Sequence, residues 1–213
     1  MRIESRESRV GSRESIVSNN GLFLFLSKTC CTPLKKEIQL HDLTFVPFIS
    51  TAEIQDTVAA LAKRIDEDYA GRNPLLLIVL NGAFIFAADL VRKISIPIRL
   101  DFIKVSSYKG TQSSGQMQEH LPWQSALEGQ DIIIVEDIVD TGNTLQYLLR
   151  KLRDQHPRSV EVACLLKKPE VYTYSDEIRY EGMSIPNKFV VGYGLDYNGL
   201  GRDLDSIYQK KEE

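Results

Sequence analysis

The sequence predicts an α/β fold with a mostly parallel sheet flanked by helices. Two short apolar runs, Leu75 to Leu80 and Asp131 to Ile134, have the composition of strands buried on both faces of a parallel sheet. Each run is followed by a turn of small residues and then by apolar residues at helical spacing. Strands that alternate with helices indicate a parallel sheet, whose ligands bind at the carboxyl ends of the strands. A site is therefore expected in the turns after these two runs.

Composition and charge are those of an ordinary soluble globular protein. The 213 residues, 43% hydrophobic and 26% charged, are enough for one large domain with a sizeable core. The net charge of −3 argues against nucleic acid held by bulk electrostatics. No apolar run approaches the roughly 20 residues that span a bilayer. The three cysteines lack the spacing of a metal or disulfide framework, which favours a reducing cytoplasm.

Residues 1–34 differ in character from the rest of the chain. They repeat Ser-Arg-Glu-Ser and have little apolar periodicity, so we expect either disorder or an extension from a misassigned start codon. A signal peptide or lipoprotein leader is the alternative, although the apolar run from Gly21 to Leu26 is shorter than a usual signal core. The folded domain is expected over residues 35–213.

The first half of this domain begins with a scaffold helix. Ser50 and Glu53 have the spacing of a capping box, and apolar residues at helical spacing continue until Gly71. The strand from Leu75 to Leu80 should then lead into a second helix. The predicted buried face of that helix consists of Phe84, Ala87, Ala88 and Val91.

The second half contains further strands, one more helix and a long loop. Strands are predicted at Ile98 to Val105, Val160 to Leu166 and Phe189 to Gly192. The apolar stripe of the helix after Ile134 consists of Leu145, Leu148, Leu149 and Leu152. Ser106 to Pro122 is rich in Gly, Ser and Gln and lacks periodicity, which predicts a long mobile loop; a plain hairpin is the alternative.

The most informative stretch is VEDIVDTGNT, Val135 to Thr144, at the end of the strand that begins at Asp131. Its last four residues leave backbone N–H groups open at a helix N-terminus, where phosphate binds well. The carboxylates before them, Glu136, Asp137 and Asp140, would repel a bare phosphate unless they hold sugar hydroxyls, a divalent cation or a proton. An acidic pair beside a phosphate turn suggests a ribose 5-phosphate group, whereas a simple capping turn is the alternative.

This stretch resembles the phosphoribosyl-diphosphate (PRPP) binding motif of the type I phosphoribosyltransferases. The resemblance covers residues 36–208 and implies that family's fold, in which a small hood region accompanies the main sheet. It implies that Glu136 and Asp137 hold the ribose hydroxyls and Mg²⁺, and that Asp140 is the catalytic general acid/base at purine N7. The residues implied to anchor the 5′-phosphate are Thr141, Gly142, Asn143 and Thr144.

The resemblance extends to two loops. Leu80, Asn81 and Gly82 match the pyrophosphate loop, whose first peptide bond is often cis in this family. Many relatives carry lysine where Asn81 stands, so backbone donors must replace that charge. Ser107 and Tyr108 match a Ser-Tyr pair in the loop that closes over the family's active site, and closure would exclude water from a reactive ribosyl cation.

The remaining matches concern the purine. Lys168 resembles the lysine that donates to a purine 6-oxo group, whereas Lys167 is read as a surface charge. In IPNKFVVGYGLDYNGLGRDL, the resemblance makes Phe189 the aromatic that stacks on the base and Val190 the backbone that reads its edge. Asp196 would lie by the purine and hold Mg²⁺, and Arg202 would reach pyrophosphate.

Together these matches imply a hypoxanthine–guanine phosphoribosyltransferase. Such an enzyme makes a nucleoside monophosphate and pyrophosphate from PRPP and a 6-oxopurine, and requires Mg²⁺. Family members are usually dimers or tetramers, so a homodimer or homotetramer is expected, without nucleic acid or a membrane as a partner. The alternatives are a transferase for xanthine or a pyrimidine, and a PRPP-sensing regulator that binds nucleic acid. The sequence does not rank hypoxanthine, guanine and xanthine.

Overall fold

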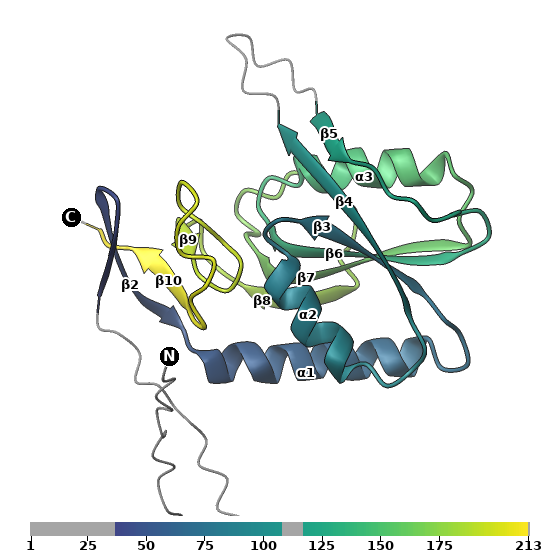
Figure 1. The fold of residues 1–213 in the computed structure, drawn as a ribbon, viewed down its shortest axis with the longest axis horizontal. Coiled ribbons are helices and arrows are strands. Elements are labelled where there is room, and N and C mark those ends of the chain that lie inside the picture. The colour runs from purple at the N-terminus through teal and green to yellow at the C-terminus, as the bar shows by residue number, and fades with distance from the viewer. Residues whose placement is uncertain (1–36, 108–116, 213) are drawn as a thin grey trace, which may run out of the picture. The chain divides into compact units, whose positions relative to one another are not determined.

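The computed structural model describes residues 37–107 and 117–212, which form a six-stranded sheet, a four-stranded sheet and three helices (Figure 1). The predicted extension at residues 1–34 lies outside the described residues. In chain order the elements are β1 (Ile38–Leu40), β2 (Leu43–Ile49), α1 (Thr51–Asp68), β3 (Leu75–Leu80), α2 (Phe84–Lys93), β4 (Arg99–Ser107), β5 (Met117–Leu121), β6 (Asp131–Val139), α3 (Asn143–Arg153), β7 (Ser159–Lys167), β8 (Tyr180–Ser184), β9 (Val190–Val191) and β10 (Ile207–Lys210).

The six-stranded sheet confirms the predicted α/β architecture. Its strand order is β5-β4-β3-β6-β7-β8, and every neighbouring pair is parallel except β4 with β5. The chain passes from β3 to β4 on one side and later returns to β6 on the other side of β3. The connections therefore diverge at the carboxyl ends of β3 and β6, which is where ligands of such sheets bind.

Helices cover both faces of this sheet (Figure 1). The strand residues Leu76, Ile78 and Val135 pack in one buried cluster with α1 and α2. Their neighbours Leu77 and Ile134 pack in another cluster with α3, because successive strand residues point to opposite faces. No helix within the described ranges is long and apolar enough to cross a membrane.

Two of the predicted helices have the expected anchors. At the start of α1 the backbone N–H of Ser50 donates to Glu53 Oε2 at 2.9 Å, and the Glu53 N–H donates to Ser50 Oγ at 3.3 Å, so the capping box is confirmed. The predicted apolar stripe of α3 is buried in full: Leu145, Leu148, Leu149 and Leu152. This helix ends at Arg153, shortly before His156.

The buried face predicted for α2 is confirmed at Ala87 and wrong at the other positions. Phe84 is exposed, and the buried residues of the helix are Phe86, Ala87 and Leu90. The segment is apolar almost throughout, so two faces one residue apart fit the helical period equally well. Packing against α1 and the sheet selects the face that contains Phe86, Ala87 and Leu90. A hydrogen bond from Gln55 of α1 to Asp89 of α2 also holds the helix in this orientation.

Two segments that were predicted as turn or loop contain strand. β6 continues through Glu136 and Asp137 to Val139, so these acids lie on a strand and only the residues after Val139 form the turn. The end of the predicted Ser106–Pro122 loop is β5, which pairs with β4 as a hairpin arm, while residues 108–116 between the arms lie outside the described residues. Both stretches contain charged or polar side chains, which interrupt the strand pattern in the sequence.

The four-stranded sheet supplies the hood region. Its order is β1-β2-β10-β9, all antiparallel, around a small core of Phe45, Val191 and Tyr208. β10 pairs with both β2 and β9 and thereby connects the start of the domain to its end. This pairing holds the glycine-rich segment after Val191 beside the carboxyl edge of the large sheet.

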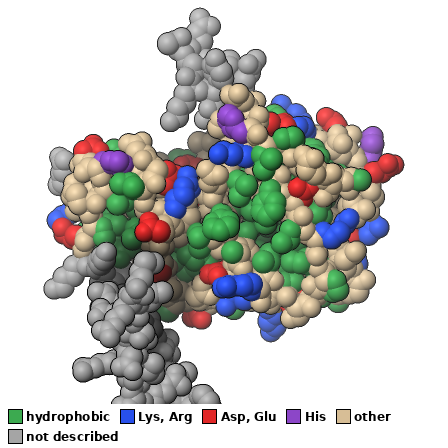
Figure 2. All heavy atoms as spheres, in the orientation of Figure 1, with side chains coloured by type: hydrophobic (Ala, Val, Ile, Leu, Met, Phe, Trp, Pro, Cys, Tyr) green, Lys and Arg blue, Asp and Glu red, His purple; other side chains and the backbone are tan. Residues whose placement is uncertain are grey.

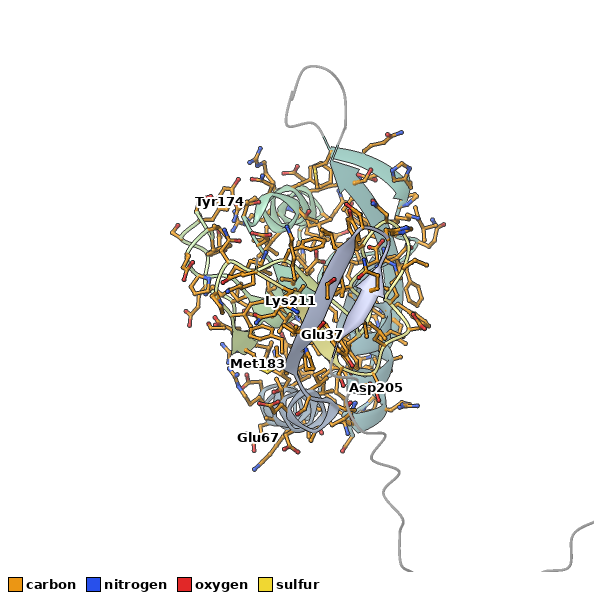
Figure 3. All side chains as sticks on the ribbon, turned by 90° about the vertical axis from the view of Figure 1, so that its left-hand side faces the viewer. Glu37, Glu67, Tyr174, Met183, Asp205 and Lys211 are labelled. Carbon is orange, nitrogen blue, oxygen red and sulfur yellow. The ribbon has the colours of Figure 1, made fainter. Side chains whose placement is uncertain are left out.

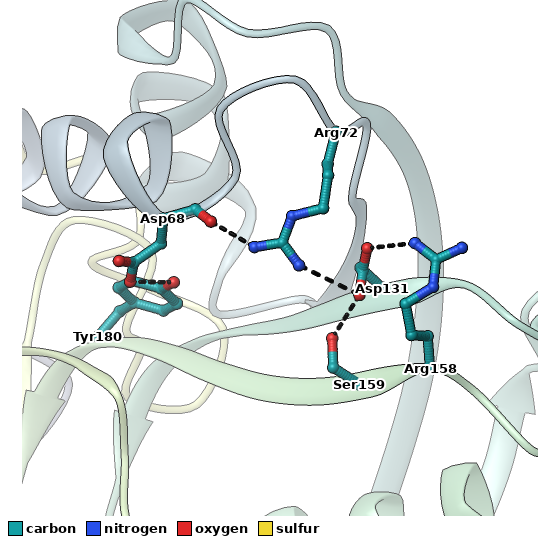
Figure 4. Close-up of polar contacts among 6 residues, drawn as sticks. All are labelled: Asp68, Arg72, Asp131, Arg158, Ser159 and Tyr180. Atoms are coloured by element: carbon teal, nitrogen blue, oxygen red, sulfur yellow. Dashed lines mark hydrogen bonds and ion pairs between the residues drawn. The ribbon is translucent and has the colours of Figure 1, made fainter.

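Buried Asp131 secures the opposite, amino-terminal edge (Figure 4). Its carboxylate accepts from Arg158 Nη1 at 2.9 Å and Ser159 Oγ at 2.7 Å, and lies 3.7 Å from Arg72 Nη1. Arg72 also donates to the Asp68 backbone oxygen at the end of α1. These contacts join α1, β6 and β7 at the edge away from the predicted site, so they serve stability.

Candidate active site

The site begins with two acids at the end of β6 that point in different directions. Glu136 lines a hollow of about 80 Å³ together with the turn that starts α3. Asp137 lies on the other side and packs directly against the end of β3, since a Cβ added to Gly82 would lie 1.8 Å from Asp137 Oδ2. Only glycine fits at position 82 without displacing the carboxylate. Two neighbouring acids can therefore serve two adjoining parts of one ligand.

The turn after β6 has the geometry of an anion site. Gly142 is the N-cap of α3 with φ of 87°, a conformation that favours glycine, and no side chain caps the helix there. The first N–H groups of α3 thus remain for a ligand, and the helix dipole favours a negative charge. The residues that line the hollow in front of this turn are Glu136, Ile138, Val139, Asp140, Thr141, Gly142, Asn143, Thr144 and Leu145.

A second, larger cleft of about 280 Å³ adjoins this hollow at Asp140. Four stretches that are far apart in sequence meet in it: the end of β3, the end of β6, the end of β7 and the segment from β9 onward. Its lining residues are Gly82, Asp137, Ile138, Asp140, Lys168, Phe189, Val190, Leu195, Asp196 and Arg202. Three of these ten residues, Ile138, Val190 and Leu195, are aliphatic. The other seven have a charged side chain, an aromatic ring or, at Gly82, only backbone. The cleft can therefore bind a flat polar ligand that also carries charge.

Lys168 and Asp140 form an ion pair within this cleft. Lys168 Nζ lies 2.9 Å from Asp140 Oδ2, and only 8% of the lysine side chain is exposed. The Lys168 backbone N–H also donates to the Val139 oxygen at 2.9 Å, which fixes the lysine to the end of β6. A buried lysine held in this way is not a solvated surface charge. Lys167, by contrast, pairs with Glu181 at 2.9 Å outside the cleft.

Arg202 and Asp196 face each other across the glycine-rich segment. Arg202 Nη2 lies 2.6 Å from Asp196 Oδ1, and Arg202 Nη1 donates to the Gly194 backbone oxygen. Gly194 in turn touches the end of β3, because a Cβ there would lie 2.1 Å from the Gly82 oxygen. The guanidinium is thus placed close to the predicted pyrophosphate loop.

The aromatic wall of the cleft is Phe189, whose side chain is 45% exposed. Its ring is held edge-on by Tyr197 at a centroid distance of 5.7 Å, and Tyr197 is itself anchored by a 2.7 Å hydrogen bond to Asp42. A half-exposed ring with a supported back is suited to stacking against a planar ligand. Tyr197 was not predicted, and only its place beside Phe189 in the fold reveals this supporting role.

Burial shapes the acidity of the two carboxyls on β6. Burial raises the pKa of Glu136 well above its usual value, and the neighbouring Asp137 charge adds to the effect. Burial likewise raises the pKa of Asp137 to about 6, although backbone N–H donors and Arg202 oppose it. Glu136 Oε2 is buried and meets no donor among the described residues. A ligand that brings hydroxyl donors or positive charge would satisfy both acids.

These acids suit a magnesium ion that is shared with a ligand. No three metal-ligating side chains are clustered in the described part of the chain. The predicted trio of Glu136, Asp137 and Asp196 is indeed divided, because Glu136 lines the hollow whereas the other two line the cleft. Mg²⁺ is commonly held by one or two carboxylates plus substrate phosphates, so Asp137 and Asp196 fit that role.

Some predicted residues do not line the cleft. Leu80 and Asn81 precede Gly82 at the end of β3, and the peptide bond between them, which the sequence left open, is cis. Ser107 ends β4, and Tyr108 lies outside the described residues. The lid prediction therefore stays a prediction.

Comparison with known families agrees with this geometry. Residues 50–198, most of the folded part, match the model of the phosphoribosyl transferase domain. The chain belongs to the phosphoribosyltransferase family. The family's match spans the end of β3, the turn before α3 and Lys168, and thus includes every residue that lines the cleft except Arg202.

Relatives within the family are close in sequence and structure. A hypoxanthine-guanine phosphoribosyltransferase of Mycobacterium avium is 43% identical over 166 residues, which cover 75% of this chain and 82% of the relative. A crystal structure of a hypoxanthine-guanine phosphoribosyltransferase from Bacillus anthracis has a TM-score of 0.73 at 35% identity, covering 76% of this chain and 96% of that chain. A hypoxanthine phosphoribosyltransferase structure from Staphylococcus aureus has a TM-score of 0.74 at 36% identity, covering 78% and 90%.

Proposed function

We propose that this phosphoribosyltransferase transfers the 5-phosphoribosyl group from PRPP to hypoxanthine or guanine. The products are IMP or GMP and pyrophosphate, which is the chemistry of purine salvage. The observation that carries the proposal is the cleft, where a buried lysine, a supported aromatic ring and two acids of the PRPP motif, Asp137 and Asp140, face one ligand-sized space. The names of the relatives support the same conclusion.

The base is bound between Phe189 and Lys168. The exposed face of Phe189 stacks on the purine, and the backbone of Val190 beside it reads the edge of the ring. Lys168 donates to the 6-oxo group, since an ammonium has three donors and no acceptor. Adenine would place its 6-amino donor against this donor, so the pocket favours 6-oxopurines.

The ribose 5-phosphate lies across the end of β6. Thr141, Gly142, Asn143 and Thr144 anchor the 5′-phosphate, while Glu136 and Asp137 accept hydrogen bonds from the ribose hydroxyls. The orphaned Glu136 Oε2 gains a donor in this way. Binding energy from the phosphate thereby aligns the reacting carbon with the base.

Pyrophosphate lies between the end of β3 and Arg202. Backbone donors at Leu80, Asn81 and Gly82 and the Arg202 guanidinium bind its oxygens. Asp137 and Asp196 would hold Mg²⁺ here, and the ion, when bound, neutralises charge on the departing pyrophosphate. Arg202 and Asp196 already pair at 2.6 Å, so they are poised to act together.

Asp140 is the general acid/base of the reaction. Ribose C1 becomes cationic as its bond to pyrophosphate breaks, and the purine nitrogen forms the new bond. Asp140 takes the proton from the purine N7, and its carboxylate lies 2.9 Å from Lys168 Nζ, which orients it in the cleft. Ser107 and Tyr108 belong to a lid that excludes water from this cation.

The same proposal includes the assembly and location of the protein. We infer a homodimer or homotetramer, because large apolar side chains are exposed on α2, β4 and β5: Phe84, Leu100, Phe102 and Leu121. Figure 2 shows hydrophobic side chains gathered over α2 and β4, and apolar patches of this kind mark protein contacts. Cytoplasmic location is supported by buried, unpaired Cys164.

A competition experiment tests the function. The protein is incubated with PRPP, Mg²⁺ and equal amounts of hypoxanthine, guanine, xanthine, adenine, orotate and uracil, and the nucleotides formed are separated. IMP or GMP as main product is expected and ranks the bases at once. A product from xanthine or a pyrimidine would assign another base. No nucleotide, together with PRPP binding by calorimetry, would indicate a PRPP sensor instead.

A further inference from the structure

The segment between β7 and β8 covers the start of α3 with two tyrosines. Added to Gly142, a Cβ would lie 2.6 Å from the ring of Tyr172 and 2.9 Å from the ring of Tyr174. The two ring centroids are 6.2 Å apart. Figure 3 labels Tyr174 beside α3, which is seen end-on in that view. Aromatic side chains thus back the phosphate turn on the side away from the end of β3.

Tyr174 reaches the turn through one hydrogen bond. Its hydroxyl donates to Asn143 Oδ1 at 2.8 Å, and Asn143 is the first residue of α3. An asparagine side chain has an acceptor oxygen and a donor nitrogen, and rotation about its last bond exchanges them. The acceptor would repel a phosphate, whereas the donor would bind it. With the oxygen engaged by Tyr174, the N–H₂ group is the half left for an anion.

The tyrosine is held firmly enough to impose this choice. Asp176, two residues later, accepts from Gln146 Nε2 at 2.6 Å and from Arg153 Nη2 at 3.0 Å, both on α3. Tyr172 donates from its hydroxyl to the Asp176 backbone oxygen at 2.9 Å. Asp176 therefore fastens the segment to α3 after Tyr174, while before it Tyr172 packs against the cluster that contains the α3 leucines.

We propose that Tyr174 is a positioning residue for the 5′-phosphate, which it serves by orienting the carboxamide of Asn143. The proposal deepens the proposed function and rests on it. Asn143 supplies a neutral donor at the helix N-terminus, and the hydrogen bond from Tyr174 to Asn143 Oδ1 favours the orientation in which the N–H₂ group faces the phosphate. Only the phosphate end of a ligand is affected, because the pyrophosphate region lies at Gly82 and Arg202.

Calorimetry with two probes tests this role. Ribose 5-phosphate occupies the phosphate turn, whereas inorganic pyrophosphate with Mg²⁺ occupies the other end of the site. We expect Tyr174→Phe, which deletes only the hydroxyl, to weaken ribose 5-phosphate by about three- to tenfold, the effect of one ordinary hydrogen bond. Pyrophosphate binding should stay as in the wild type. In steady-state kinetics, KM for PRPP should rise and kcat should change little.

A double-mutant cycle separates positioning from general loosening. If Tyr174 acts through Asn143, then Tyr174→Phe added to Asn143→Ala costs nothing further in ribose 5-phosphate affinity. The same loss in both backgrounds, an equal loss for both probes, or unchanged affinity in Tyr174→Phe would overturn the proposal. A wild-type protein that binds neither probe would instead overturn the proposed function itself.

Discussion

Asp137→Asn is expected to make the free protein more stable at neutral pH while it weakens activity. The Asp137 carboxyl is enclosed against Gly82, and burial raises its pKa from the usual 3.8 to about 6. A carboxyl with a higher pKa in the folded than in the unfolded chain opposes folding once it ionises. This cost is absent below about pH 4, grows between pH 4 and 6, and is complete above pH 6. An amide in its place carries no charge at any of these values.

The size of the gain follows from the pKa. The pKa of Asp137 rises from 3.8 to about 6, and each unit of this rise corresponds to about 1.4 kcal/mol. The gain in the free energy of unfolding therefore has an upper limit of about 3 kcal/mol. Water reaches part of the site, so we expect an increase of about 1–3 kcal/mol in the free energy of unfolding at pH 7.5. For a chain of this size that is about 2–12 °C in Tm. In the Asp137→Asn variant, the side-chain amide oxygen can still accept hydrogen bonds from the backbone N–H groups that donate to the carboxylate in the wild type.

Thermal unfolding at pH 7.5 and pH 4.5 provides the measurement, and Asp131→Asn provides the matched control. Asp131 and Asp137 lie on the same strand, β6. The Asp131 carboxylate, however, has side-chain partners, which are Arg158 and Ser159. Its amide variant should therefore lose about 1–3 kcal/mol at pH 7.5. The reasoning fails if Asp137→Asn lowers Tm at pH 7.5, or if its gain is as large at pH 4.5.

Three further substitutions test the site and the apolar patch. Asp140→Asn should keep PRPP binding but lower kcat by at least about tenfold; turnover near that of the wild type would remove Asp140 from its role. Lys168→Ala should raise KM for hypoxanthine and guanine by about tenfold or more, the effect of a lost charged hydrogen bond, with KM for PRPP affected less. An unchanged purine KM would show that Lys168 does not read the base. Phe102→Asp should reduce the mass measured by light scattering to that of a monomer, and an unchanged mass would place the interface elsewhere.

Strands and helices were predictable where packing alone determines the sequence. β3 has the predicted bounds, Leu75–Leu80, because all six side chains are apolar, the first five are buried and none is a polar group kept for a ligand. β6 was predicted to end at Ile134, yet it continues to Val139 through two acids. Function placed carboxylates where packing would place apolar residues, so the hydrophobic pattern ends before the strand does.

The site was predictable in its parts but not in its arrangement. The turn from Thr141 to Thr144 could be assigned to phosphate from local chemistry, since helix N-termini bind anions wherever they occur. The ion pair between Asp140 and Lys168 joins residues that are 28 positions apart, and no periodicity relates them. Only the parallel pairing of β6 with β7 brings them together. The resemblance to a family, not spacing, led to Lys168.

The close approach of Gly82, after β3, to Asp137 and Gly194 explains why the site lowers the stability of the folded protein. Gly82 is in contact with the Asp137 carboxylate on one side and, through its oxygen, with Gly194 on the other. This close approach removes water from Asp137 and thereby raises its pKa. The same approach brings Arg202, which bonds to the Gly194 oxygen, within reach of that carboxylate. A substrate that brings hydroxyl donors and a cation would offset the desolvation of the acids, so binding and folding stability are coupled at this junction.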